Sequence, residues 1–148
     1  MADALDDPPP GIVLVNVAFA GTGVVAGTSA ASALLPGTFG IVHAVVSCVL
    51  FAVGTGALLW AYALGVSRSR EEAVTIPGLF WLAGAVAPAD VRRPLRIALA
   101  IEVVAVVAAA AVRPYSEVAF GILAPLFGLG LMAVWGGQHG SFPVKAER

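Results

Sequence analysis

Four long apolar runs constrain this chain more than any other feature. They cover residues 11–35, 38–66, 96–112 and 118–135, and turn-forming or charged residues separate them. A hydrocarbon core about 30 Å thick needs about 20 apolar residues in an α-helix. No water is available there to bind free backbone groups, so a run that crosses the membrane must be helical. The sequence therefore predicts an all-α membrane protein with four transmembrane helices.

Composition agrees with this fold class and excludes others. Charged residues make up only 11% of the chain and hydrophobic residues 59%, whereas soluble domains carry about 25% charged residues. The net charge of −1 leaves no basic surface for a nucleic acid. Two histidines and one cysteine lie far apart, without the spacing of metal ligands. We therefore expect no nucleic-acid partner, no metal, no cofactor and no catalysis by this chain.

Positive charges predict the orientation. Five arginines lie between the second and third runs, and two more positive residues follow the fourth run, whereas one arginine lies on the opposite side. Because lysine and arginine mark cytoplasmic segments, we expect both termini in the cytoplasm. The predicted organisation is a disordered cytoplasmic tail (residues 1–10), a transmembrane domain (residues 11–136) and a second cytoplasmic tail (residues 137–148). The residues behind this prediction are Arg68, Arg70, Arg92, Arg93, Arg96, Lys145 and Arg148, opposed by Arg113.

The long connection, residues 67–95, predicts a segment in the cytoplasmic membrane interface. Its apolar part, residues 76–88, is too short to span a bilayer, so it lies in the interface or dips in and returns. Trp81 is typical of membrane interfaces. Arg92, Arg93 and Arg96 follow it, and they either bind anionic lipid head groups or serve only as topology signals.

Small and polar residues share one face on several of the predicted helices. Asn16 lies on a stripe with Gly23 and Gly27, which form a GxxxG motif, and Glu102 lies on a stripe of alanines. Membrane helices pack closely through small residues and bind one another through polar ones. We therefore predict helix–helix or partner contacts at Asn16, Gly23, Gly27, Glu102, Ala105 and Ala109.

Glu102 is the acid that most needs an explanation, because acids inside membrane spans are functional by default. Counted from Arg96, it lies at the same depth as Asn16, so an Asn16–Glu102 hydrogen bond is geometrically available. Two interpretations remain open: a proton-linked or cation-binding acid, and a hydrogen-bonded acid that holds the bundle together. His43, near the outer boundary, is either a packing residue or part of a proton relay. Pro125 predicts a kink in the fourth span, for packing or as a hinge.

The C-terminal third carries a resemblance. Residues 113–143 contain an Arg-Pro turn, a helix rich in proline and glycine, and a terminal His-Gly-Ser-Phe-Pro. This pattern resembles the C-terminal half of small uncharacterised integral membrane proteins of actinobacteria. The resemblance implies a multi-pass protein of a bacterial plasma membrane, and no activity or catalytic residue comes with it.

Three functions follow as hypotheses. The first is an accessory or structural subunit of a larger membrane enzyme or transporter complex, held by other membrane subunits or by self-association. The second is a small proton-coupled transporter that uses Glu102. The third is a lipid-interacting protein that binds membrane lipids through residues 76–96.

Overall fold

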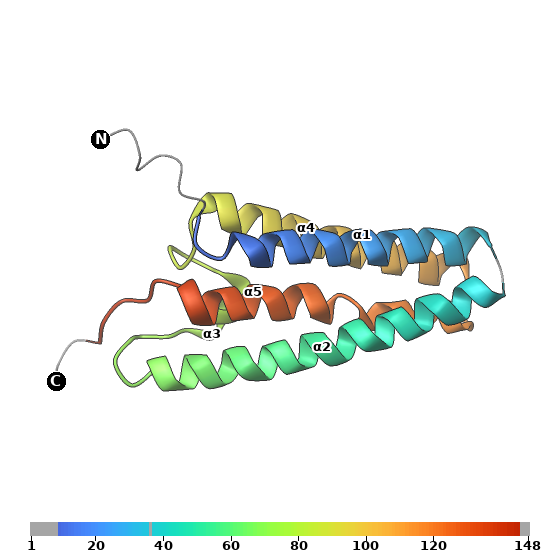
Figure 1. The fold of residues 1–148 in the computed structure, drawn as a ribbon. Helices are drawn as coiled ribbons and strands as arrows, with labels where there is room; N and C mark the ends of the chain where they lie inside the picture. Colours follow the sequence, from blue (N-terminus) through green and yellow to red (C-terminus); the bar gives the residue numbers. More distant parts are fainter. Residues whose placement is uncertain (1–8, 36, 146–148) are drawn as a thin grey trace.

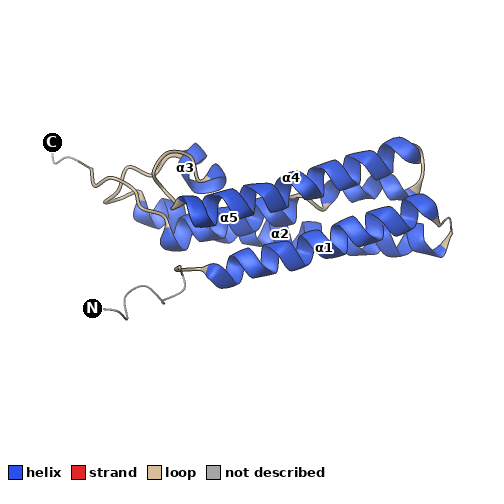
Figure 2. Ribbon diagram, turned by 90° about the horizontal axis from the view of Figure 1, so that it is seen from above, coloured by secondary structure: helices blue, strands red, loops and turns tan. Residues whose placement is uncertain are grey.

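A computed structural model describes residues 9–35 and 37–145 of the chain. The long helices lie side by side in one elongated bundle, and both described chain ends and α3 lie at the same end (Figures 1 and 2). We call this the proximal end, and the end with the α1–α2 and α4–η2 connections the distal end. The elements, in order, are α1 (Ile12–Leu34), α2 (Thr38–Arg68), α3 (Ile76–Trp81), α4 (Ala89–Val112), the 3-10 helix η2 (Glu117–Leu123) and α5 (Leu126–His139).

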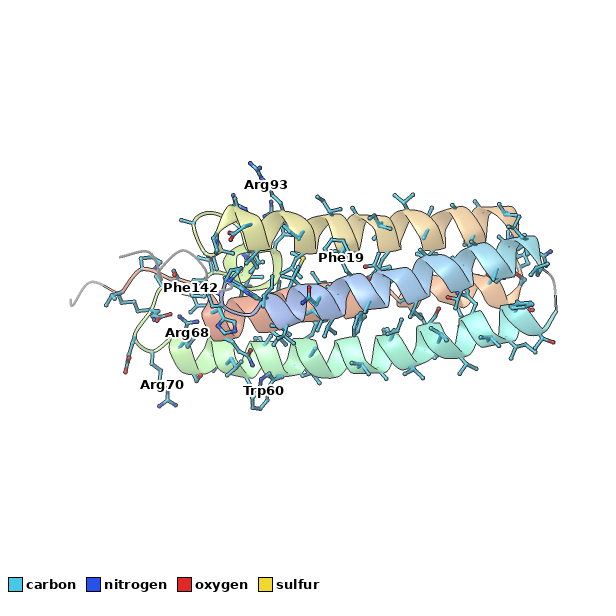
Figure 3. All side chains as sticks on the ribbon, turned by 45° about the horizontal axis from the view of Figure 1, so that its top comes forward. Phe19, Trp60, Arg68, Arg70, Arg93 and Phe142 are labelled. Carbon is cyan, nitrogen blue, oxygen red and sulfur yellow. The ribbon has the colours of Figure 1, made fainter. Side chains whose placement is uncertain are left out.

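The predicted fold class is confirmed. Within the described residues, α1, α2, α4 and the combined segment Glu117–His139 are long and apolar enough to cross a membrane. The predicted tail of residues 1–10 lies outside the described residues except for Pro9 and Pro10. The described lysines and arginines gather at the proximal end, where Arg70 and Arg93 point outward (Figure 3), and only Arg113 lies at the distal end.

The third long helix begins earlier than the apolar run predicted. The run starts at residue 96, but α4 starts at Ala89, directly after Pro88, and carries Asp90 in its first turn. An acid in the first turn favours a helix start because it offsets the positive end of the helix dipole. Hydropathy marks where a helix becomes apolar, whereas the backbone becomes helical some turns earlier. Much of the predicted interfacial connection is therefore helix.

The fourth span is interrupted rather than kinked. The chain forms a 3-10 helix up to Leu123, passes through Ala124 and Pro125, and continues as α5 from Leu126. Pro125 has no amide hydrogen and cannot continue the hydrogen-bond ladder, so the break falls where its chemistry requires one. A new helix consequently starts inside the bundle, and its N-terminal backbone amides lie there too.

Direct backbone contact brings α5 into the centre of the bundle. A methyl group at Gly54 of α2 would stand 2.5 Å from the carbonyl carbon of Leu126, and one at Gly130 of α5 would stand 2.6 Å from the carbonyl oxygen of Gly54. Only glycine permits this approach, which small residues provide generally between membrane helices. Eight consecutive residues of α5, Gly130 to Gly137, are buried as a result. The remaining helices surround α5, with α1 against α4 and α2 against α5.

Arg68 fixes the proximal end. Its guanidinium donates to the carbonyl oxygens of Gly137 (3.1 Å) and Gly140 (2.7 Å), forms an ion pair with Glu72 (2.8 Å), and lies 5.3 Å from the ring centre of Phe142. A cation at a helix C-terminus binds carbonyls that the helix leaves free. The segment after α5 then pairs with residues 71–73 through Ala73 N to Pro143 O (2.7 Å) and Lys145 N to Glu71 O (3.0 Å). Much of the terminal His-Gly-Ser-Phe-Pro motif thus serves this closure.

Substitution of Gly54 tests the α2–α5 crossing. We expect Gly54→Ala to lower the free energy of unfolding by about 1–3 kcal/mol, because the added methyl group overlaps the α5 backbone. Gly56→Ala on the same helix is the matched control, since a methyl group there meets no atom within 4 Å. Thermal unfolding in mild detergent measures both variants, and equal midpoints for G54A and G56A would contradict the crossing.

Removal of the Arg68 side chain tests the proximal closure. Arg68→Ala should raise amide hydrogen exchange in residues 140–145 about tenfold or more, because it loses two carbonyl contacts, an ion pair and an aromatic contact. Arg70→Ala removes an exposed arginine two positions away and should leave that exchange unchanged. Mass spectrometry of the exchanged peptides gives the readout, and similar exchange in R68A and R70A would refute the assigned role.

Candidate functional site

A buried carboxyl group lies at the centre of the bundle. The side chain of Glu102 is 0% exposed, near the middle of α4, and its Oε1 accepts a hydrogen bond from the hydroxyl of Thr22 (3.1 Å), near the middle of α1. Thr22 also donates to the carbonyl oxygen of Ala18 (2.9 Å) and lies 3.4 Å from that of Ala98. One hydroxyl proton serves these acceptors in turn, so Glu102 has a partner that it shares with two carbonyls.

The break in the fourth span faces the same carboxyl group. A methyl group at Gly128 would stand 2.7 Å from Glu102 Oε2, so only a glycine lets the acid approach the first turn of α5. The backbone amide of Gly128 faces the carboxyl group, yet Oε2 forms no hydrogen bond within the described residues. The start of a helix carries partial positive charge and free amides. Glu102 is therefore placed against the start of α5, which lies inside the bundle, as in membrane proteins whose broken helices bind ions.

The expected hydrogen bond between Asn16 and Glu102 is not formed. Asn16 is exposed on α1, and Thr22 takes the place predicted for it. The depth estimate was wrong because it began α4 at Arg96. The helix begins at Ala89, so Glu102 lies deeper along it and pairs with the middle of α1. Ala109 is buried with Glu102 on one face of α4, and Ala105 is half-buried there.

A second group of polar residues, buried except for the half-buried Thr28, lies between this carboxyl group and the distal end. We call it the distal polar cluster. His43 is 0% exposed, and its Nδ1 lies 3.1 Å from the hydroxyl oxygen of Thr28, while its Nε2 lies over Gly121 without a hydrogen-bond partner. The hydroxyls of Ser29 and Ser47 are buried and unpartnered as well. The members of the cluster are Thr28, Ser29, Ser32, His43 and Ser47.

The small-residue stripe of α1 faces away from the bundle. Asn16, Gly23 and Gly27 are exposed, and a methyl group at either glycine would meet no atom within 4 Å. Beside this stripe a shallow groove of about 240 Å³ runs between α1 and α4, with Ser29 among its lining residues. Its other lining residues are almost all alanines: Ala26, Ala30, Ala33, Ala105, Ala108, Ala109 and Val112.

The residues predicted to meet lipid head groups divide into two kinds. Trp81 and Arg93 are exposed at the proximal end, and Arg93 points outward (Figure 3). Arg96, by contrast, donates to the carbonyl oxygen of Trp81 (2.7 Å), and Arg92 donates to that of Gly84. These two arginines therefore hold the turn after α3, where Leu82 and Gly84 have positive φ angles.

Thr22 is the site residue that sequence reasoning missed. The signal was present, because Thr22, Ser29 and Ser32 recur on one face of α1 together with Ala18, Gly21 and Val25, and all six are buried. The helix contacts of α1 were instead predicted at the stripe with Asn16 and the GxxxG motif. Both faces of α1 are built of small residues, so periodicity alone does not tell which face meets the bundle.

Comparison of the chain with family models, with curated proteins and with solved structures found no match.

A double-mutant cycle tests the central pair. Thr22→Val should lower the free energy of unfolding, and the loss should shrink by about 1 kcal/mol when Glu102 is Leu, because hydrogen bonds between membrane helices contribute about that much. Thr55→Val is the control, since that hydroxyl binds only the Phe51 carbonyl on its own helix. Unfolding in mild detergent measures the four variants of the cycle. Strict additivity of the two substitutions would show that the Thr22–Glu102 bond contributes nothing.

Proposed function

We propose that the protein is an accessory subunit of a larger bacterial membrane enzyme or transporter complex, and that it binds a transmembrane helix of its partner through the outer face of α1. The observation that carries the proposal is the exposed stripe on that face. Asn16, Gly23 and Gly27 share it with Ala20 and Ala30, and all five are exposed.

The energetics of lipid favour a partner on this stripe. An amide that lacks a hydrogen-bond partner in hydrocarbon costs on the order of several kcal/mol. Asn16 is the fifth residue of α1, roughly 6 Å along the helix axis, and its side chain is exposed on the outer face of the helix. A partner helix with a polar side chain at this level would satisfy the amide, and the two glycines would let its backbone approach closely.

The shape of the surface supports the same proposal. Phe19 and Val24 are exposed beside the stripe, and the groove between α1 and α4 lies next to it. Small residues flanked by larger ones form a shallow channel that a helix can fill. Apart from Ser29, whose hydroxyl oxygen is buried, the residues that line this groove are apolar.

Site-specific photocrosslinking in native membranes tests the proposal. A photoreactive residue at Gly27 should crosslink to a different membrane protein, and the substitution Gly23→Leu should abolish this crosslink. The same photoreactive residue at Val104 is the control, because Val104 is 68% exposed on α4 and belongs neither to the stripe nor to the groove. If the crosslinks join only copies of this chain, the stripe binds a second copy and the proposal of a different partner is wrong. Equal crosslinking from Gly27 and Val104 would also contradict the proposal.

A second candidate function, proton-coupled transport, is favoured by one observation. Glu102 is buried in mid-bundle with Oε2 unpartnered, and it faces the start of α5 at the break in the fourth span. Acids inside membrane proteins frequently belong to proton relays, and interrupted helices frequently mark ion sites. In this case Glu102→Gln would abolish proton-dependent substrate flux in proteoliposomes, whereas an accessory subunit would keep its partner contacts in that variant.

A further inference from the structure

Buried polarity is distributed unequally along the bundle. Within the described residues, the buried polar and charged side chains are Thr22, Ser29, Ser32, His43, Ser47 and Glu102. Thr22 and Glu102 lie at mid-bundle, and the others lie between them and the distal end. The proximal half is instead filled by one apolar core, which includes Leu82, Val91, Leu95, Met132 and Trp135.

Unpartnered polar atoms follow the same division. Four buried side-chain atoms of the described bundle have no hydrogen-bond partner: Ser29 Oγ, His43 Nε2, Ser47 Oγ and Glu102 Oε2. Glu72 Oε2 also lacks a hydrogen bond, but it forms an ion pair with Arg68. Buried polar atoms are nearly always hydrogen-bonded to protein or to ordered water. Within residues 9–35 and 37–145, the distal half therefore offers several binding points for water, and the proximal core offers none of this kind.

One face of α2 carries two of these points, at His43 and Ser47. Gly40, His43, Ser47, Leu50 and Gly54 recur every three or four residues, which places them on one stripe. At the distal mouth, Glu117 lies over Gly40, because a methyl group there would stand 2.5 Å from Glu117 Oε1. At the other end, Gly54 touches the first turn of α5, which faces Glu102.

An apolar layer interrupts this stripe once. Val25, Val106 and Ala124 are buried together, and Leu50 packs against them. The layer lies between Ser47 and Glu102, and Ala124 belongs to the break in the fourth span. Ser47 is seven residues from Gly54, so the polar cluster ends roughly 10 Å from the level of the carboxyl group. A short apolar constriction of this kind excludes water until it widens.

We propose that Glu102 is a proton-binding site that exchanges its proton with the distal end along this stripe of α2, through a gate formed by Val25, Leu50, Val106 and Ala124. No cation among the described residues pairs with Glu102, and an ionised acid without one is costly in a bundle interior. The titratable groups along the stripe are Glu117 at the mouth and His43 behind it. The elements that pack on Glu102 present Thr22 from α1 and Gly128 from α5, and neither residue carries a titratable side chain.

Infrared spectroscopy of the full chain in lipid bilayers tests the proposal. The spectrum of the wild type should contain a carbonyl band of a protonated carboxylic acid that disappears in Glu102→Gln. Transfer into D₂O shifts this band as the proton exchanges, so the rate of the shift measures access of water to Glu102. This readout concerns the carboxyl group alone, and it succeeds or fails whether or not α1 binds a partner.

Substitutions at two matched valines on α4 test from which end of the bundle water reaches Glu102. Val106→Thr places a hydroxyl in the gate and should speed the exchange about tenfold, because it lowers the cost of water in the layer. Val91→Thr makes the same change in the proximal core, where Val91 is equally buried, and should leave the rate unchanged. Equal acceleration by both variants, or faster exchange in V91T, would overturn distal access.

A milder pair of variants tests the stripe without altering the gate. Ser47→Ala should slow the exchange severalfold because it removes a hydroxyl from the route. Ser32→Ala removes an equally buried hydroxyl that binds only Ser29 O on its own helix, and it should have no effect. The proposal would be overturned by equal rates in these two variants, or by the absence of a Glu102-dependent band from the wild type.

Discussion

The rest of the structure depends on the direct backbone contact between α2 and α5. Because Gly54 and Gly130 carry no side chain, the two helices approach closely enough to place α5 in the middle of the bundle. Around that central helix, α4 can bring Glu102 against Gly128, and α1 can bring Thr22 to the same acid. A larger residue at the crossing would move α5 outward and separate the groups that meet at its first turn.

The interrupted fourth span links packing to chemistry. Pro125 ends the 3-10 helix and lets α5 start inside the bundle, where the amide of Gly128 faces a carboxyl group. A continuous helix would present closed hydrogen bonds to Glu102 at this level. The break thus creates polar surface at the depth where α4 carries its buried acid, Glu102, and the apolar proximal core separates this surface from the charged end.

Much of the fold follows from the sequence, for physical reasons. Hydropathy predicted four spans because the membrane requires long apolar helices, and Pro125 predicted the irregularity of the fourth span. The start of α4 was missed by seven residues, from 96 to 89, since arginines and Pro94 mask a helix that has not yet become apolar. The partner of Glu102 was missed because α1 carries small residues on both faces. Only the positions of α4 and α5 determine which face is covered.

The central claim is that Glu102 turns inward to Thr22 and the first turn of α5. Solid-state NMR in lipid bilayers measures this directly, with ¹³C in the glutamate carboxyl groups, ¹⁵N in the glycine amides and Glu102→Gln to assign the signal. The account predicts a strong dipolar coupling between the Glu102 carboxyl carbon and a glycine amide that is lost in Gly128→Ala, with no coupling to the side-chain nitrogen of Asn16. Coupling to Asn16, or contact of the carboxyl group with lipid acyl chains, would contradict it.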